Sequence, residues 1–149
     1  IALTSPMVFG GNGAQEFLCK RYPSVLVLFL RGFAPRMVRR LFQQRLADYE
    51  MRDMCSGNQP VNVAIASGCF MLMRTHTLRA VHGFNDDFFL YFEDFDLSLR
   101  LRKQGRLVFD PAMRIVHHGG YAASKGWLHL KYFISSAVMF FNRHGWRWI

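Results

Sequence analysis

Apolar residues recur at helical spacing directly after a dense aromatic run in the second half of the chain. Phe92, Phe95 and Leu99 follow one another at intervals of three and four residues, as on one face of an α-helix. A basic run and then a glycine end the pattern, which is typical of a helix C-terminus. The sequence therefore predicts a helix whose first turn contains the adjacent carboxylates Glu93 and Asp94.

Two further segments have helical spacing. Residues 127–143 carry apolar side chains every three or four positions, and Gly145 ends the pattern. Residues 75–81 form a shorter segment, which Thr75 can cap and Gly83 can end. We expect both segments to be helices.

A basic amphipathic helix is predicted over residues 36–49, with Pro35 near its start. Such a helix either packs its apolar side on its own domain and leaves its arginines in water, or lies on an anionic membrane surface. The sequence leaves both interpretations open. The apolar face consists of Met37, Val38, Leu41, Phe42 and Leu46.

Short apolar or alternating runs predict β-strands between these helices. Pro111 separates the last two runs, and the glycine-rich residues 10–13 lack the spacing of a phosphate-binding loop, so we interpret them as a turn. Strands that alternate with helices indicate a layered α/β domain. The predicted strands cover residues 1–3, 24–30, 61–66, 106–110 and 113–116.

The composition is that of one globular domain with an excess of positive charge. Of its 149 residues, 51% are hydrophobic and 15% aromatic, which excludes a disordered tail. The formal net charge is +9, and residues 20–52 contain eight basic residues but only two acidic ones. Such a patch attracts polyanions or is simply a solvated face. Because no RNP, zinc-finger or helix-turn-helix pattern accompanies the charge, we expect no nucleic-acid partner.

Cysteine usage and the length of apolar runs bear on location. Cys19, Cys55 and Cys69 are odd in number and form no CxxC pair, which favours reduced thiols in the cytoplasm. The longest apolar run, residues 25–30, is far shorter than the ~20 residues of a membrane-spanning helix. Peripheral contact with the inner face of the cell membrane stays open.

The candidate chemistry lies in Glu93 and Asp94. Free N–H groups and the helix dipole at a helix start favour a charged carboxylate, which can then accept a proton from a hydroxyl group. The alternative is that both residues only provide the negative charge that helix N-termini commonly carry.

Several motifs follow one another along the second half of the chain. They occupy residues 67–74, 83–89, 91–100, 117–120 and 140–146. Taken in this order and at this spacing, they closely resemble the C-terminal half of family 2 glycosyltransferases. The similarity is to the rhamnosyltransferase-like branch, which acts in bacterial cell-surface polysaccharide assembly.

This resemblance implies a GT-A fold, with a mixed sheet and flanking helices, and an inverting displacement at the anomeric carbon of a nucleotide sugar. Asp94 matches the general base, and Glu93 would orient the base or hold the acceptor. The resemblance also assigns acceptor contacts to Ser67, Gly68 and Tyr91.

A divalent metal, Mn²⁺ or Mg²⁺, would bind together with the donor diphosphate. Its ligands in this chain would be His117 or, as second choice, His118; a histidine pair at a strand end is otherwise usually structural. The acceptor would be a glycan or a lipid-linked glycan.

Two departures from the family pattern affect this interpretation. The nucleotide-binding half with its Asp-x-Asp motif has no counterpart, so residues 1–149 are expected to be the acceptor-side portion of one domain. Asp94-Phe95-Asp96 has the letters of that motif, but helical spacing would splay its carboxylates, and we do not assign it that role. Asn85 also stands where the family usually has an acidic residue.

Two functions of different classes follow. The first is the acceptor-side portion of an inverting glycosyltransferase. The second is a non-catalytic module, derived from a truncated transferase, that binds glycan or a membrane surface. An incomplete sheet would leave an open edge, which favours self-association.

Overall fold

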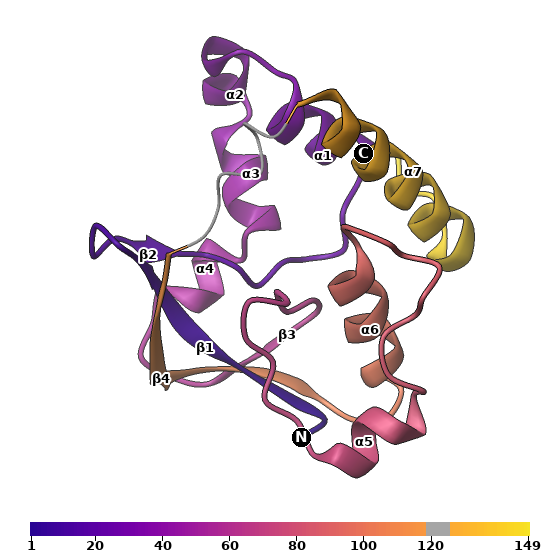
Figure 1. Cartoon of the computed structure of the whole chain (residues 1–149). Coiled ribbons are helices and arrows are strands. Elements are labelled where there is room, and N and C mark those ends of the chain that lie inside the picture. The colour runs from indigo at the N-terminus through magenta and orange to yellow at the C-terminus, as the bar shows by residue number, and fades with distance from the viewer. Residues whose placement is uncertain (119–125) are drawn as a thin grey trace.

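The computed structural model describes residues 1–118 and 126–149. A four-stranded sheet has the order β2-β1-β4-β3 and is flanked by helices (Figure 1). The elements in chain order are β1 (Leu3–Gly10), β2 (Gln15–Glu16), α1 (Val25–Gly32), α2 (Arg36–Leu41), α3 (Gln43–Tyr49), α4 (Arg52–Cys55), β3 (Val61–Val63), α5 (Thr75–Ala80), α6 (Glu93–Leu101), β4 (Leu107–His117) and α7 (Trp127–His144).

The sheet is mixed, and its central pair joins two strands that are far apart in the sequence. Strand β1 pairs in parallel with β4 and antiparallel with β2, and β3 pairs antiparallel with β4. Both central strands bring apolar residues to a core that Leu97 and Leu101 of α6 complete. The prediction of an α/β arrangement is confirmed, and the fold is compatible with part of a GT-A-like domain.

The strand predictions at both central positions were too short. Strand β1 continues through Pro6 to Gly10, and β4 runs unbroken through Pro111 to His117. The register shifts here: Pro6 faces Asp110, but Met7 faces Arg114. Pro111 therefore lies in a bulge, where its missing N–H costs no ladder hydrogen bond.

The prediction of a strand over residues 24–30 is wrong, because this segment forms helix α1. The side chain of Ser24 caps it, with Oγ accepting a hydrogen bond from the N–H of Val27 at 3.2 Å. Leu28 packs with Phe140 and Phe141 of α7 in an aromatic cluster. Tertiary burial on α7 thus determines the conformation of an apolar run that has no clear period.

The predicted helix over residues 36–49 is divided into α2 and α3 at Phe42, which leaves the helical region (φ −107°, ψ 18°). Part of its apolar side does not pack on the domain: Met37 is 80% exposed and Leu41 is 83% exposed, whereas Val38 and Leu46 are half-buried. The interpretation that this face packs on its own domain is therefore wrong for these two residues.

The remaining helix predictions are confirmed with small shifts. Helix α7 ends at Gly145, whose N–H donates to the carbonyl of Phe141 at 2.8 Å. Helix α5 begins at Thr75, one residue earlier than predicted, so Arg74 and not Thr75 occupies the cap position. The turn predicted at residues 10–13 joins β1 to β2.

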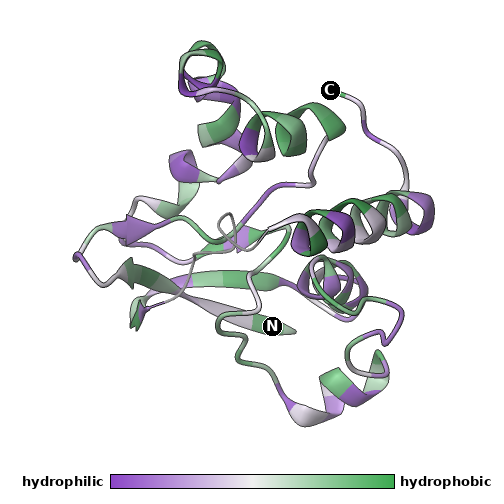
Figure 2. Ribbon diagram, turned by 45° about the horizontal axis from the view of Figure 1, so that its top comes forward, coloured by the Kyte–Doolittle hydropathy of each residue, from purple (hydrophilic) through white to green (hydrophobic). Residues whose placement is uncertain are grey.

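Helix α7 packs between α1 and α6 and forms the second core of the molecule. In Figure 2, α1 is hydrophobic along most of its length, and α7 alternates hydrophobic with polar residues. Phe140 is fully buried and its ring lies 5.4 Å from that of Phe92, at the start of α6. Aromatic packing of this kind fixes where α6 begins. Among the described residues, no helix is long and apolar enough to cross a membrane.

Candidate active site

The start of α6 has an unusual backbone. Tyr91 and Phe92, the two residues before the helix, both adopt positive φ angles of 68° and 64°. This left-handed conformation costs a non-glycine residue about 1–2 kcal/mol. The buried ring of Phe92, packed against Phe133 and Phe140, stabilises it. Backbone strain of this kind is common at functional sites. Here the left-handed conformation of Tyr91 and Phe92 sets the direction of the first turn of α6.

Asp94 lies in that first turn and turns its carboxylate toward the segment after β3. Its Oδ2 accepts a hydrogen bond from the N–H of Gly68 at 2.8 Å, and its Oδ1 accepts one from the N–H of Phe95 at 2.9 Å. Partial burial raises the pKa of Asp94 to about 6, while these backbone N–H groups hold it lower than burial alone would, and the charge of Glu93 raises it further. Asp94 is therefore mainly ionised at neutral pH, yet its basicity exceeds that of an ordinary aspartate.

The segment that holds Gly68 is tied to the same helix by a buried serine. The hydroxyl of Ser98 accepts a hydrogen bond from the N–H of Ala66 at 3.1 Å and lies 3.4 Å from the carbonyl of Ala66. Ser67 in turn accepts a hydrogen bond from the N–H of Cys69 at 3.4 Å. Of the residues predicted to contact an acceptor, Gly68 thus contacts Asp94, and Ser67 is its neighbour in the chain. Their contact with an acceptor stays a prediction.

Glu93 is oriented differently from Asp94. Its Oε2 is buried and has no hydrogen-bond partner among the described residues. A buried carboxylate oxygen without a hydrogen-bond partner costs free energy. Such an oxygen is common where a ligand supplies the missing donor. The predicted role of Glu93 in orienting the base or holding an acceptor stays a prediction.

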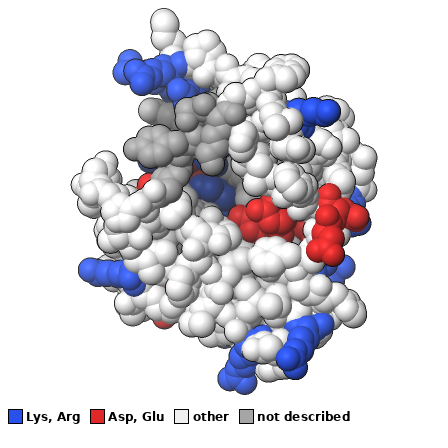
Figure 3. Space-filling model, viewed as in Figure 1, with Lys and Arg blue, Asp and Glu red and all other residues white. Residues whose placement is uncertain are grey.

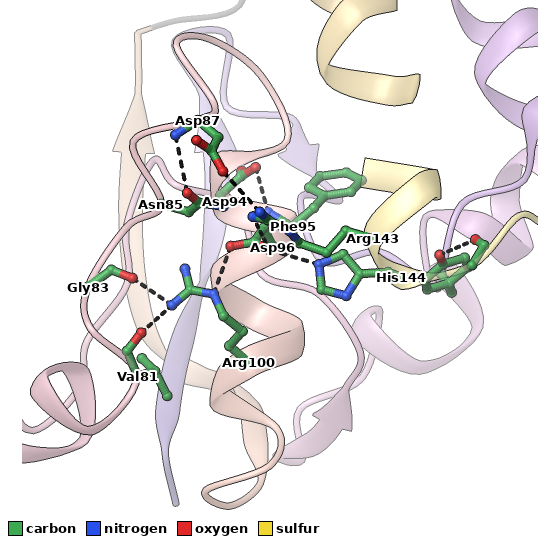
Figure 4. A network of polar contacts seen from close by, with 12 residues as sticks. Val81, Gly83, Asn85, Asp87, Asp94, Phe95, Asp96, Arg100, Arg143 and His144 are labelled. Carbon is green, nitrogen blue, oxygen red and sulfur yellow. Dashed lines mark hydrogen bonds and ion pairs between the residues drawn. The ribbon is translucent and has the colours of Figure 1, made fainter. Parts of the chain in front are cut away.

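Asp96 points away from the site and has a structural role. Its fully buried carboxylate accepts hydrogen bonds from Nε of Arg100 at 2.7 Å and from Nε2 of His144 at 2.8 Å (Figure 4). Arg100 also donates to the carbonyls of Val81 and Gly83. Asp94 and Asp96 therefore diverge, as the helical spacing predicted, and do not form a shared pair of ligands.

A hollow opens beside the start of α6. In Figure 3, acidic atoms lie on its wall at the start of this helix, and basic atoms lie within it. Tyr49 is close to this place: burial raises the pKa of its hydroxyl, and the negative charge of Asp94 raises it further. The guanidinium of Arg31 lies 5.4 Å from the centroid of the Tyr49 ring. The buried phenol of Tyr49 is thus affected by the positive charge of Arg31, which lowers its pKa, as well as by the negative charge of Asp94.

The predicted metal ligands lie at the end of β4. Nδ1 of His117 is 3.3 Å from Oε2 of Glu16 on β2. His118 lies beside Gly11, where a Cβ would approach its Nδ1 to 3.1 Å. Across the described ranges, 1–118 and 126–149, no group of three or more His, Cys, Asp or Glu side chains could hold a metal ion. The predicted metal role of His117 and His118 stays a prediction, and residues 119 and 120 of the predicted motif lie outside the described residues.

Tyr91, also predicted to contact an acceptor, turns toward α7. Its hydroxyl lies 3.0 Å from Nδ1 of His129, and its ring packs edge-on against Phe133. Its predicted contact with an acceptor stays a prediction.

Sequence reasoning missed Glu16, Gly11 and Ser98 as members of this region. Glu16 and His117 are 101 residues apart and meet only because β1 and β4 pair in parallel. Gly11 carried a signal, because glycine is common where another group approaches the backbone closely. A serine within an apolar helix face, such as Ser98, also indicates a buried hydrogen bond.

Parts of the chain are similar to rhamnosyltransferases, although no protein-family model matches it. Over 53 residues it is 43% identical to the rhamnosyltransferase WbbL of Escherichia coli strain K12. This aligned stretch covers 35% of this chain and 20% of that protein. Over 60 residues it is 37% identical to the N-acetylglucosaminyl-diphospho-decaprenol L-rhamnosyltransferase of Mycobacterium tuberculosis, in strains CDC 1551 and H37Rv. This aligned stretch covers 40% of this chain and 20% of that enzyme. The chain thus spans about a fifth of the length of these curated relatives. These partial matches relate the chain to glycosyltransferases.

Proposed function

We propose that this chain is the acceptor-side portion of an inverting glycosyltransferase and that Asp94 is its general base. The observation that carries the proposal is the Asp94 carboxylate, which is held by the N–H of Gly68 at 2.8 Å and has its pKa raised to about 6 by partial burial. A base of this strength at a hollow suits the removal of a proton from a sugar hydroxyl near neutral pH. The partial similarity to rhamnosyltransferases supports the class of reaction.

The proposed reaction is a single displacement. The acceptor hydroxyl oxygen attacks the anomeric carbon of the donor sugar, and Asp94 takes the hydroxyl proton. The bond between the anomeric carbon and the diphosphate oxygen breaks, and the nucleoside diphosphate leaves with the bonding electrons. Because attack and departure occur on opposite faces, the anomeric configuration inverts.

Glu93 and the segment at Ser67 would contact the acceptor. The buried Oε2 of Glu93 has no hydrogen-bond partner within the described parts of the chain, so a second acceptor hydroxyl is a suitable donor for it. The fixed distance between Gly68 and Asp94 would keep the base from rotating away.

The relatives suggest which substrates to test. We propose a nucleotide-activated L-rhamnose as donor and a lipid-linked diphosphate sugar, as in the name of the mycobacterial enzyme, as acceptor. Such an acceptor places the reaction at the inner face of the cell membrane, within the synthesis of a cell-surface polysaccharide.

A divalent cation would offset the negative charge of the leaving diphosphate. His117 and Glu16 are the residues of this chain that would hold it. Mg²⁺ and similar hard cations often take only one or two protein ligands and complete their shell with phosphate oxygens and water. A partial ligand set at the end of β4 is consistent with that arrangement.

The test is transfer of L-rhamnose from its dTDP- or UDP-linked form to N-acetylglucosaminyl-diphospho-decaprenol, followed by the mass of the product. The variants are Asp94→Asn and, as a matched control, Asp87→Asn, an exposed carboxylate paired with Arg143. If this chain has no turnover, the substitutions are made in the longest natural polypeptide that contains it. Loss of the base should reduce kcat by roughly 10²–10⁴-fold.

Nucleotide binding should be nearly unchanged by Asp94→Asn, because the base contacts the acceptor and not the nucleotide. Full activity of Asp94→Asn would assign the role to another residue. Absence of both transfer and nucleotide binding in the longer polypeptide would favour a non-catalytic binding module.

A further inference from the structure

Helices α1 to α3 expose an unusual combination of apolar and basic side chains. Met37 and Leu41 on α2 are 80% and 83% exposed. Phe29 and Phe33, at the end of α1, are 54% and 47% exposed and stack on each other at 5.8 Å between ring centroids. We call these four residues, together with Arg36, Arg39, Arg40 and Arg45, the α1–α3 surface. Because α1 and α2 contact each other, these exposed apolar side chains lie on neighbouring helices, which indicates an interaction site.

Most of the basic side chains of this region line a groove of about 610 Å³, although Arg45 does not. Glu50 is the one acidic residue among those that line it, and it already pairs with Arg52 at 2.6 Å and Arg31 at 3.8 Å. The other arginines of the groove, Arg36, Arg39 and Arg40, have no carboxylate within ion-pair distance in the described parts of the chain. Their positive charge is therefore available to an anionic partner.

The distribution of charge argues against a second copy of this chain as the partner. Residues 17–47 contain seven Lys and Arg and no acidic residue. A symmetric contact through the α1–α3 surface would bring these arginines against one another, because such an interface pairs the same patch from each copy. Like charges facing each other across an interface are unfavourable.

We infer that the α1–α3 surface docks on an anionic lipid bilayer. A bilayer interface offers phosphate-bearing headgroups to the arginines and an apolar boundary to Met37, Leu41 and the two phenylalanines. Helices with basic and apolar side chains of this kind lie in the plane of such an interface. The contact inferred here is made at the bilayer surface by side chains of α1, α2 and α3.

This inference is independent of the transfer reaction, but it deepens the proposed function. Arg31 lines the groove and also packs over Tyr49, whose hydroxyl is electrostatically coupled to Asp94. A chain docked through the α1–α3 surface would hold Asp94 near the headgroup layer, where a lipid-linked acceptor presents its sugar. This last step rests on the proposed function.

The experiment is sedimentation of the chain with vesicles of phosphatidylcholine, or of equal parts phosphatidylcholine and phosphatidylglycerol, at low and high salt. We expect binding to the anionic vesicles only, weakened by salt. Arg36→Gln/Arg40→Gln should weaken it about 25-fold, at roughly fivefold for each arginine. Met37→Ser/Leu41→Ser should weaken it about tenfold or more, because the apolar side chains lose their burial.

The matched control is Arg102→Gln/Lys103→Gln, which removes the same charge from two exposed residues at the other end of the molecule, after α6 (Figure 1). Its vesicle binding should equal that of the wild type. Asp94→Asn should also bind normally, so failure of the catalytic proposal is distinguishable from failure of this one. Far-UV circular dichroism verifies that each variant is folded.

Three outcomes would overturn the inference. The first is the absence of binding to anionic vesicles at low salt. The second is an equal loss in the control, since the effect would then come from total charge and not from this surface. The third is lipid-free self-association, seen by analytical ultracentrifugation, that Met37→Ser/Leu41→Ser abolishes; the partner would then be a second copy.

Discussion

The buried carboxylate of Asp96 on α6 accepts a hydrogen bond from Nε2 of His144, 2.8 Å away in the last turn of α7. The same carboxylate pairs with Arg100, which fixes the loop at Val81 and Gly83 (Figure 4). One acidic side chain thus joins three segments that surround the candidate base. Because Asp94 lies in the same helix two residues earlier, this network also positions the carboxylate that we propose as the base.

Asp96→Asn should lower the free energy of unfolding by about 3 kcal/mol or more, because it leaves the partly buried Arg100 without its counter-charge. Chemical denaturation followed by tryptophan fluorescence measures the change. The control is Asp87→Asn, which removes the exposed partner of Arg143 and should cost less than about 1 kcal/mol. An equal loss of unfolding free energy in the two variants would show that the buried network stabilises the fold no more than an exposed ion pair does.

Ser98→Ala should destabilise the fold by about 1–3 kcal/mol, because it removes the partner of the buried N–H of Ala66. It should also loosen the segment that holds Gly68 against Asp94. Hydrogen exchange checks this: the Gly68 amide should exchange faster in the variant, while the amides of the β1–β4 pairing stay protected. Unchanged exchange at Gly68 would mean that Ser98 does not position the segment.

The helices with a strong period could be predicted from sequence, whereas α1 and the central strands could not. Helices α6 and α7 show regular spacing and end at or shortly before a glycine, so local signals suffice. Helix α1 is apolar almost throughout, and packing against Phe140 and Phe141 of α7 makes it helical. From the sequence, Pro111 predicts the end of a strand. The bulge that accommodates this proline is recognised only from the pairing of β4 with β1.

In the candidate site, too, some features could be predicted from the sequence and others could not. The placement of Asp94 in the first turn of α6 follows from local spacing. The environment that raises its pKa comes from burial, which no local pattern specifies. The contact between Glu16 and His117 depends on the pairing of strands that are far apart in the sequence. The periodicity of apolar residues does not predict contacts between residues that are this far apart in the sequence.

His82→Gly should raise the free energy of unfolding by about 0.5–1 kcal/mol. His82 is exposed and has a φ of 60°, a conformation that costs L-residues free energy and that glycine adopts readily. The gain is smaller than the full strain, because glycine loses more entropy on folding. Thermal denaturation measures it, with His82→Ala as the control, which keeps the Cβ and should give no gain. A gain of equal size with alanine would place the effect in the imidazole and not in the backbone.

His117→Ala should weaken the metal-dependent part of nucleotide binding. Calorimetric titration with UDP and dTDP, with and without Mn²⁺, separates this part from binding of the nucleotide alone. Loss of one metal ligand should lower affinity in the presence of Mn²⁺ by on the order of tenfold or more and leave metal-free binding unchanged. His76→Ala, an exposed histidine on α5, is the control. An unchanged Mn²⁺ effect in His117→Ala would remove this residue from the proposed cation site.

The pH dependence of stability tests the environment of Asp94 without any substrate. An unfolded aspartate has a pKa of about 3.9, and the folded value is raised to about 6. Between these values the folded state binds more protons than the unfolded state, so the Asp94 contribution to stability falls as pH rises. The full shift corresponds to almost 3 kcal/mol, and because the side chain is partly hydrated we expect about 1–2 kcal/mol.

The free energy of unfolding of the wild type should therefore fall relative to that of Asp94→Asn as pH increases from about 4 to about 7. The asparagine can still accept the hydrogen bond from Gly68, so the difference reports the charge and not the loss of a contact. Asp86→Asn, which removes an exposed carboxylate from the loop before α6, controls for net charge. A difference between wild type and Asp94→Asn that stays constant with pH would mean an ordinary aspartate. If the difference does change as expected, the same ionisation should set the acid limb of kcat/KM for transfer near pH 6, since only the carboxylate can accept the hydroxyl proton.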